Sequence, residues 1–307
     1  MKRLALILLL AAGCSLTSFA CDICGCGVGN SYIGILPDFN KRIMGLRYRY
    51  NSIFSHVGVG GSNTYLTTEE RYRNIELWMG WNITSNFRLM ASAPYSINQR
   101  INQGATTSKN GIGDISLSGL YQIINTSHGV LNNKLLVQSL WIGAGIKLPT
   151  GKYNPIDKSS DNQTANLFQL GTGSVDFLFT AMYDLRLQDA GINLSGTYKI
   201  NTANRYDYSY GSKISSNAQL YYKFRIREKV TVAPNGGLQF ESAAKDLDHD
   251  LAVDISGGNL LLGTIGVETS FKKMSIGGNW QTPFHQDLAN GIVKANNRMM
   301  VHVSFLL

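Results

Sequence analysis

The chain has 307 residues and a formal net charge of +8 at pH 7. Charged residues make up only 16% of it, against roughly 25% in an average soluble domain. The basic residues are scattered and form no cluster, so the charge does not indicate nucleic-acid binding. The mean hydropathy of −0.07 excludes a bundle of transmembrane helices. It does not exclude a membrane β-barrel, whose lipid-facing and lumen-facing residues average to neutral.

Residues 1–20 read as an export signal. Lys2 and Arg3 form a basic start, and the apolar stretch 4–12 that follows is too short to span a bilayer as a helix. Ser18-Phe19-Ala20 fits a small-x-small cleavage site. We therefore expect an exported chain whose mature form begins at residue 21.

The cysteines allow several interpretations. Cys14 ends a stretch that resembles a lipoprotein signal, so a lipid on Cys14 is an alternative to cleavage after residue 20. Cys21, Cys24 and Cys26 lie in a Cys/Gly-rich segment, residues 21–41, which we expect in the periplasm or as a plug in a lumen. Three thiolates at this spacing can bind a Cu or Zn ion. They can equally form a disulfide in an oxidising compartment.

From residue 42 onward the chain repeats stretches of about ten residues in which apolar and polar side chains alternate. That period is typical of strands with one face in lipid and the other in water. The strands expected in chain order cover residues 44–50, 75–83, 87–98, 114–123, 140–148, 174–184, 192–200, 217–226, 230–240, 261–267, 274–284 and 301–307. The predicted fold is all-β, a single antiparallel transmembrane β-barrel of about 12 strands over residues 42–307.

The connections support this fold over a soluble β-sandwich. Short links such as 84–86 and 272–273 alternate with long polar links such as 51–69 and 150–166. This alternation is typical of outer-membrane barrels, which have short periplasmic turns and long outer loops. With an even strand count, both termini are expected in the periplasm. The last strand, ending at Leu307, resembles the signal read by the barrel-assembly machinery, which is an expected partner together with outer-membrane lipid.

Charged residues fall mainly on the polar faces of these strands and are expected to line the lumen. Seven are basic and four acidic, which predicts a mildly basic lumen in which most charges pair. Asp114 and Asp176 are expected to bind arginines such as Arg47 and Arg49. The full predicted set comprises Arg47, Arg49, Glu76, Arg88, Asp114, Lys147, Asp176, Asp184, Lys199, Lys223 and Arg225.

The sequence offers little that indicates catalysis. His302 and Ser304 share one face of the last expected strand, which is faintly like a Ser/His hydrolase pair. Both belong to the polar face of that strand, so we interpret them as lumen residues and predict no enzyme.

Three short motifs resemble a known family of outer-membrane proteins. Gly111–Ile115, Gly145–Gly151 and Leu170–Asp176 are similar to the family labelled "meta-pathway of phenol degradation", which resembles, distantly, the long-chain fatty acid transporter barrels. The segment Cys21–Gly27, followed by Ser31–Pro37, resembles barrels associated with heavy-metal loci. These resemblances imply transport across the bacterial outer membrane without naming the cargo.

The resulting functional hypothesis is an outer-membrane channel or transporter for a small solute, either hydrophobic or metal-linked. The alternatives are an outer-membrane hydrolase and a structural or adhesive barrel. A serine-reactive probe separates the first alternative from a channel. The second would need large, aromatic-rich outer loops, whereas the links here are of moderate size and polar.

Overall fold

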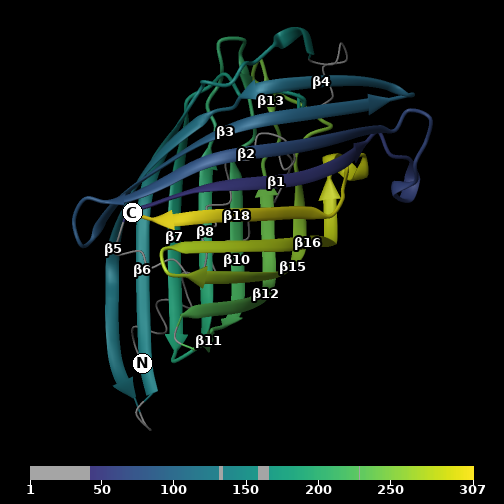
Figure 1. Ribbon diagram of the computed structural model, residues 1–307. Coiled ribbons are helices and arrows are strands. Elements are labelled where there is room, and N and C mark those ends of the chain that lie inside the picture. The colour runs from purple at the N-terminus through teal and green to yellow at the C-terminus, as the bar shows by residue number, and fades with distance from the viewer. Residues whose placement is uncertain (1–41, 131–133, 158–165, 228) are drawn as a thin grey trace, which may run out of the picture.

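The computed structural model describes residues 42–130, 134–157, 166–227 and 229–307, and these residues form an antiparallel β-barrel (Figure 1). Twelve strands make a closed wall. They are β1 (Ile43–Ser55), β2 (Thr68–Asn82), β3 (Phe87–Asn102), β5 (Ile115–Val130), β6 (Lys134–Leu148), β7 (Asp176–Leu187), β8 (Ala190–Ile200), β10 (Lys213–Tyr222), β12 (Val230–Ala243), β15 (Gly258–Phe271), β16 (Met274–Leu288) and β18 (Arg298–Leu306). The predicted fold and strand number are confirmed.

Shorter elements lie between the wall strands. They are β4 (Ala105–Ile112), β9 (Tyr208–Ser209), β11 (Phe224–Ile226), β13 (Leu247–Asp248), β14 (Leu251–Ala252), β17 (Lys294–Ala295) and the single 3-10 turns η1 (Val59–Gly61), η3 (Pro155–Asp157) and η4 (Ala289–Gly291). Within the described ranges, no helix is long and apolar enough to span a membrane.

The wall closes because its first and last strands pair. Ile43 of β1 is opposite Leu306 of β18, and the same strand pairs with β2 along its other edge. A closed barrel leaves no open sheet edge, so the backbone groups of its wall strands find partners inside the sheet. Both ends of the wall therefore lie at the same end of the barrel, next to the turn that joins β2 and β3.

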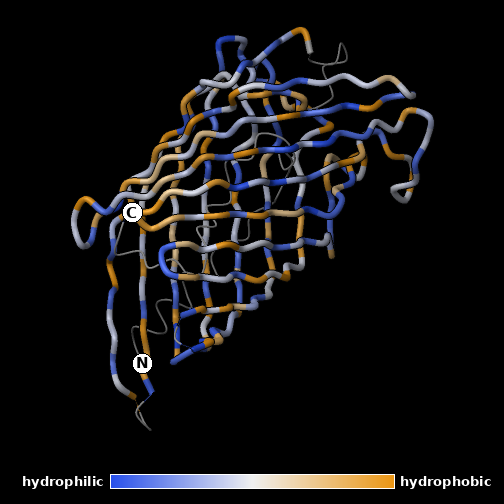
Figure 2. The backbone as a smooth tube through the Cα atoms, in the orientation of Figure 1, coloured by the Kyte–Doolittle hydropathy of each residue, from blue (hydrophilic) through white to orange (hydrophobic). Residues whose placement is uncertain are grey.

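Alternation along each strand separates two faces, as Figure 2 shows in the changing colours along the wall. On β2, Ile75, Leu77 and Met79 point outward and are 43–48% exposed, whereas Glu76 and Trp78 between them are buried inside. The outward set is apolar because it faces lipid, and the inward set is polar or aromatic. This pattern is the one the sequence predicts.

Because the outward face of the wall contacts lipid, a charge placed on that face is expected to destabilise the barrel more than a charge placed in a loop. Leu117 on β5 is 44% exposed on the outward face. Leu117→Arg is expected to lower the free energy of unfolding by about 2–4 kcal/mol, the cost of an arginine near the bilayer midplane. Leu66, which is 50% exposed in the loop after β1, is the control, and Leu66→Arg should change stability by less than about 0.5 kcal/mol. Urea titration in lipid vesicles measures both. Equal losses would contradict the assigned membrane face.

The two ends of the barrel differ in their connections. Residues 83–86, 188–189 and 272–273 make short turns at the end that holds Ile43 and Leu306. The opposite end carries the longer connections 149–175, 201–212 and 244–257. We refer to these as the short-turn end and the long-loop end. The long-loop end also carries the structures described below.

One hairpin is absent from the expected strand map. β3 continues past its pairing with β5 and forms a hairpin with β4, in which Ile101 is opposite Thr106. The chain breaks from β4 to β5 at Gly113, whose N–H donates to the carbonyl of Pro94. Residues 99–113 lie between two expected strands, where the sequence pattern predicts only a link. The break sets Asp114 at the rim of the barrel.

Candidate functional site

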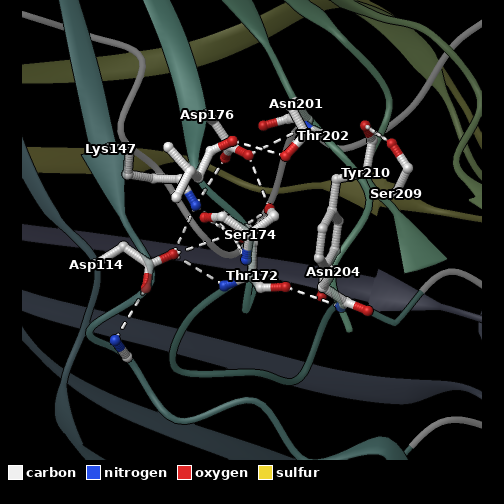
Figure 3. A network of polar contacts seen from close by, with 12 residues as sticks. Asp114, Lys147, Thr172, Ser174, Asp176, Asn201, Thr202, Asn204, Ser209 and Tyr210 are labelled. Carbon is white, nitrogen blue, oxygen red and sulfur yellow. Dashed lines mark hydrogen bonds and ion pairs between the residues drawn. The ribbon is translucent and has the colours of Figure 1, made fainter. Parts of the chain in front are cut away.

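A buried lysine between two aspartates forms the centre of the candidate site (Figure 3). Lys147, at the end of β6, places its Nζ 2.7 Å from Asp114 Oδ2 and 2.7 Å from Asp176 Oδ2. All three residues are buried, with Lys147 and Asp176 fully enclosed. We call them the ion triad. The predicted pairing of Asp114 and Asp176 with Arg47 and Arg49 is wrong, because Lys147 occupies the register position opposite Asp176 and lies closest to both carboxylates.

The ion triad holds the long connection between β6 and β7. Asp114 Oδ1 accepts the N–H of Gly151 at 2.9 Å, and its Oδ2 accepts the N–H of Thr172 at 2.9 Å. A Cβ on Gly151 would lie 2.7 Å from the Cα of Gly171, so the two backbone stretches need glycine to approach this closely. Three motifs distant in sequence thus meet around one lysine.

The segment held in this way, residues 166–172, turns inward and crosses the inner face of the β3–β4 hairpin. Lys109 Nζ donates to the carbonyl of Phe168 at 2.5 Å, and Asn98 donates to the carbonyl of Gln169 at 3.1 Å. The Arg100 guanidinium lies 4.4 Å from the centre of the Phe168 ring, within cation–π range. We call residues 166–172 the inward segment.

The inward segment completes an apolar cluster inside the barrel. Leu167 packs into a cluster on one arc of the wall, which includes Ile53 and Tyr72 from β1 and β2 and Leu260 and Leu262 from β15. Because Leu167 comes from the β6–β7 connection, which lies across the ring from β15, the inward segment reaches across the lumen to this cluster. We call the cluster the apolar seal; its buried members are Ile53, Tyr72, Leu167, Ala243, Leu260, Leu262, Leu288, Ala289, Val293 and Ala295.

Polar contacts tie the inward segment to the neighbouring loops. Tyr208 donates to Asp246 Oδ2 at 2.5 Å and accepts the N–H of Asn166 at 3.2 Å. Tyr210 donates to the carbonyl of Asn166 at 2.9 Å. Burial raises the pKa of the Tyr153 hydroxyl, which accepts from Asn166 Nδ2 and stays neutral at physiological pH. Three loops therefore form one hydrogen-bonded cap at the long-loop end.

The predicted charges on the first strands lie on the inner face and form a second group. Arg47 and Arg49 both pair with Glu76, Arg47 at 3.4 Å. Arg88 donates to Asn82 Oδ1 at 2.7 Å, and its guanidinium lies 4.3 Å from the centre of the Trp141 ring. These residues are separate from the ion triad.

The remaining predicted charges lie on β7, on β8, just after β10 and on β11. Asp184 accepts from the Tyr221 hydroxyl at 3.0 Å, and Lys199 is buried. Lys223 lies 5.3 Å from the Tyr221 ring centre. The side chain of Arg225 is 60% exposed at the short-turn end and pairs with Asp189. The predicted metal ligands Cys21, Cys24 and Cys26 lie outside the described residues.

The residues considered for catalysis are both buried on the inner face of β18. Ser304 Oγ makes no hydrogen bond within the described part of the chain. His302 is opposite Arg47 in the register and lies over Gly277. Among the residues that the structure describes, no group of three or more His, Cys, Asp or Glu side chains is arranged to hold a metal ion.

The sequence did not predict that residues 166–172 turn into the lumen. The key members of this inward segment, Leu167 and Phe168, lie just after the expected long link and share no strand periodicity with it. The one signal available was the glycine-rich stretch Leu170–Asp176, where glycines recur at every second position. Such spacing indicates close backbone packing and not a regular lipid-facing strand.

Comparisons with known proteins agree with this architecture. A crystal structure of an outer-membrane channel from Pseudomonas putida F1 matches with a TM-score of 0.57 and 14% identity, covering 92% of this chain and 100% of that one. The β domain of the Bordetella autotransporter BrkA matches with a TM-score of 0.51 and 9% identity, covering 87% and 100%. At these identities the likeness establishes the fold, that of outer-membrane barrels.

A search of curated proteins gives no significant match. A family model, in contrast, matches residues 52–291, which is most of the barrel and includes all three motifs noted in the sequence. The chain belongs to the outer-membrane β-barrel family described as "Putative MetA-pathway of phenol degradation".

Proposed function

We propose that this protein is a passive outer-membrane channel for a small, uncharged solute, closed in the observed conformation by the apolar seal. The proposal rests on the residues of the apolar seal and on the inward segment, which lies across the lumen. At the long-loop end, Leu167 of the inward segment packs into a buried apolar cluster whose other members belong to the wall strands and to the residues between β16 and β18. Apolar constrictions exclude ions by dewetting and open when a few side chains move.

The way the closure is attached supports a channel over a purely structural barrel. The inward segment is held by hydrogen bonds with Asp114, Lys109 and Asn98. Such contacts can exchange for water when the segment moves. A structural barrel gains nothing from an enclosed cluster that joins loop and wall in this reversible way. The Pseudomonas putida protein of similar fold is described as a channel.

Reconstitution of the purified protein tests this function. In planar bilayers we expect a mostly closed state at low voltage with brief openings. In proteoliposome swelling we expect uncharged solutes to enter faster than ions of the same size. Vesicles made with protein that has been unfolded by heat are the control. Swelling no faster than in those vesicles, for every solute tested, would rule out a channel.

The proposal also covers how the barrel is oriented in the outer membrane and how it is inserted there. With the short turns and both ends of the wall in the periplasm, the cap and the inward segment would face the outside. Phe305 is 45% exposed and Leu307 62% exposed on the outward face, and both would be read by the barrel-assembly machinery. Labelling of whole cells through a cysteine introduced in η3 tests the orientation, since a periplasmic position would leave it unlabelled.

A metal-linked cargo is a second candidate that rests on the sequence alone. The C-x-x-C-x-C spacing of Cys21, Cys24 and Cys26 suits one soft ion such as Cu(I) or a Zn ion. Reduced mature protein would bind one equivalent, and the Cys24→Ser, Cys26→Ser variant would bind none. Equal binding by both, or a disulfide that persists in the isolated protein, would remove this candidate.

A further inference from the structure

We infer that the inner wall formed by β10, β12, β15 and β16 holds a binding subsite for uncharged, hydroxyl-bearing solutes. The inference rests on the proposed function and specifies the kind of solute that the channel takes. It is carried by four polar side chains, Gln219, Asn235, Thr264 and Asn279, which we call the amide wall.

The register of the sheet brings the amide wall together. Gln219 is opposite Gly237, which is opposite Thr264 on the next strand. One row toward the short-turn end, Asn235 is opposite Gly266, which is opposite Asn279. Each row thus places a glycine between two hydrogen-bonding side chains. Since the inward side chains of neighbouring rows lie next to one another, the four groups share one patch of the inner face.

The polar atoms of the amide wall lack partners. Both amide atoms of Gln219, Oδ1 of Asn235, Oγ1 of Thr264 and Oδ1 of Asn279 are buried and form no hydrogen bond within the part of the chain that the structure describes. Gln219 is 1% exposed and Thr264 3%. Buried polar groups are almost always hydrogen-bonded, so a cluster of unpartnered ones indicates a guest that supplies the missing partners.

The neighbouring rows are different. Gln281, which is opposite Thr264, donates to Gln239 of the next row toward the long-loop end at 2.7 Å, and Gln239 donates to Glu241 at 2.5 Å. Toward the short-turn end, Ser275 donates to Glu268 at 2.9 Å. These neighbouring side chains therefore make hydrogen bonds to one another, whereas the five polar atoms of the amide wall named above make none within the described residues.

The glycines let the polar side chains of the two rows approach closely. A Cβ at Gly266 would lie 2.8 Å from Asn235 Oδ1 and 3.0 Å from the Cβ of Asn279. The carbonyl oxygen of Gly278 would also lie 2.8 Å from that Cβ, so Gly266 lies between the two asparagine side chains, with Asn235 Oδ1 close beside it.

The chemistry of the four groups selects hydroxyls without charge. Gln219 offers a donor and an acceptor, Thr264 a hydroxyl, and the two asparagines their unpartnered side-chain oxygens. A hydroxyl group both donates and accepts, so it satisfies each of these groups. No member of the amide wall carries a charge that would compensate an ionic solute, and burying an uncompensated charge is costly. The apolar seal further along the lumen also favours an uncharged solute, because burying a charge among apolar side chains is costly.

Saturation-transfer NMR on the full-length protein in detergent tests binding independently of transport. The probes are ribitol, an uncharged polyol, and ribonate, its charged relative of the same carbon count. The test variant is Gln219→Met, Thr264→Val, which keeps side-chain volume and removes the polar atoms. The control variant is Gln122→Met on β5, where the amide already donates to Ser139 at 3.3 Å. Heat-modifiable mobility on gels shows that each variant is folded.

We expect ribitol to give a signal with the wild type and with Gln122→Met, reduced at least fivefold in the double variant, and ribonate to give little with any of them. A ribitol signal that is the same in the wild type and the double variant would overturn the inference, and so would a ribonate signal as strong as that of ribitol. Absence of ribitol binding to the wild type would overturn it as well. Binding without swelling in proteoliposomes would instead overturn the proposed channel and leave the subsite in place.

Discussion

Lys147→Met is expected to be the most damaging single substitution in the barrel. It leaves Asp114 and Asp176 facing each other in a buried site, where their only cation within 3 Å in the described structure is the Lys147 ammonium. Removing one partner of a buried charge cluster costs about 3–5 kcal/mol, because the remaining charges are neither solvated nor paired. Part of this loss will appear as release of the β6–β7 connection, whose Thr172 and Gly151 amides bind Asp114.

Two measurements separate these effects. Urea unfolding in vesicles reports the loss of stability, and limited proteolysis of the folded protein reports release of the connection. Arg225→Met is the control, because Arg225 pairs with Asp189 at an exposed site and such pairs contribute about 0–1 kcal/mol. If Lys147→Met and Arg225→Met were equally stable and equally resistant to protease, the ion triad would not hold the connection.

The wall of the barrel was predictable because its signal is local. Outward residues such as Leu117 and Phe179 face lipid and their neighbours face the lumen, so each strand carries its own alternation. The β3–β4 hairpin escaped prediction for the same reason. Residues 105–111 are largely polar on both faces, as expected of a hairpin that projects beyond the lipid, and they leave no alternation to detect.

The candidate site depends on contacts that no local pattern encodes. Asn98 binds Gln169 across 71 residues of sequence, and Thr172 binds Asp114 across 58. The sequence marked Asp114, Lys147 and Asp176 as inward charges, but their pairing followed from the break before β5 and from the return of the chain at Gly171. Lys147 and Asp176 pair because they are opposite each other in the β6–β7 register, whereas Asp114 lies outside the strands and is positioned by the break at Gly113.

The inward segment and the amide wall together give the lumen a consistent character. Charges such as Arg49 and Glu76 are paired at the wall, and Glu241 lies between Lys213 and Arg298. Paired charges fix the shape of the lumen without attracting ions strongly. What remains for a passing solute is an apolar constriction and a row of neutral hydrogen-bonding groups, which is the environment that a small uncharged solute requires.

Leu167→Asp is expected to open the channel. Leu167 is 5% exposed among the side chains of the apolar seal, and a carboxylate there has no cationic partner among the seal's members. Burying it costs more than the roughly 1.4 kcal/mol that changes a two-state ratio tenfold. The segment must therefore leave the seal or water must enter it, and either event hydrates the constriction. Single-channel recordings should show an open fraction at least about tenfold above that of the wild type.

Ile156→Asp provides the matched control for this result. Ile156 belongs to the same connection but is 87% exposed in η3, so its replacement adds the same charge without touching the seal. Its open fraction should equal that of the wild type, and Leu167→Met, which keeps the seal apolar, should also remain closed. Unchanged heat-modifiable mobility shows that the wall of each variant is intact. If Leu167→Asp stayed as closed as Ile156→Asp, the apolar seal would not be the closure of this channel, and the barrier would have to lie elsewhere along the lumen.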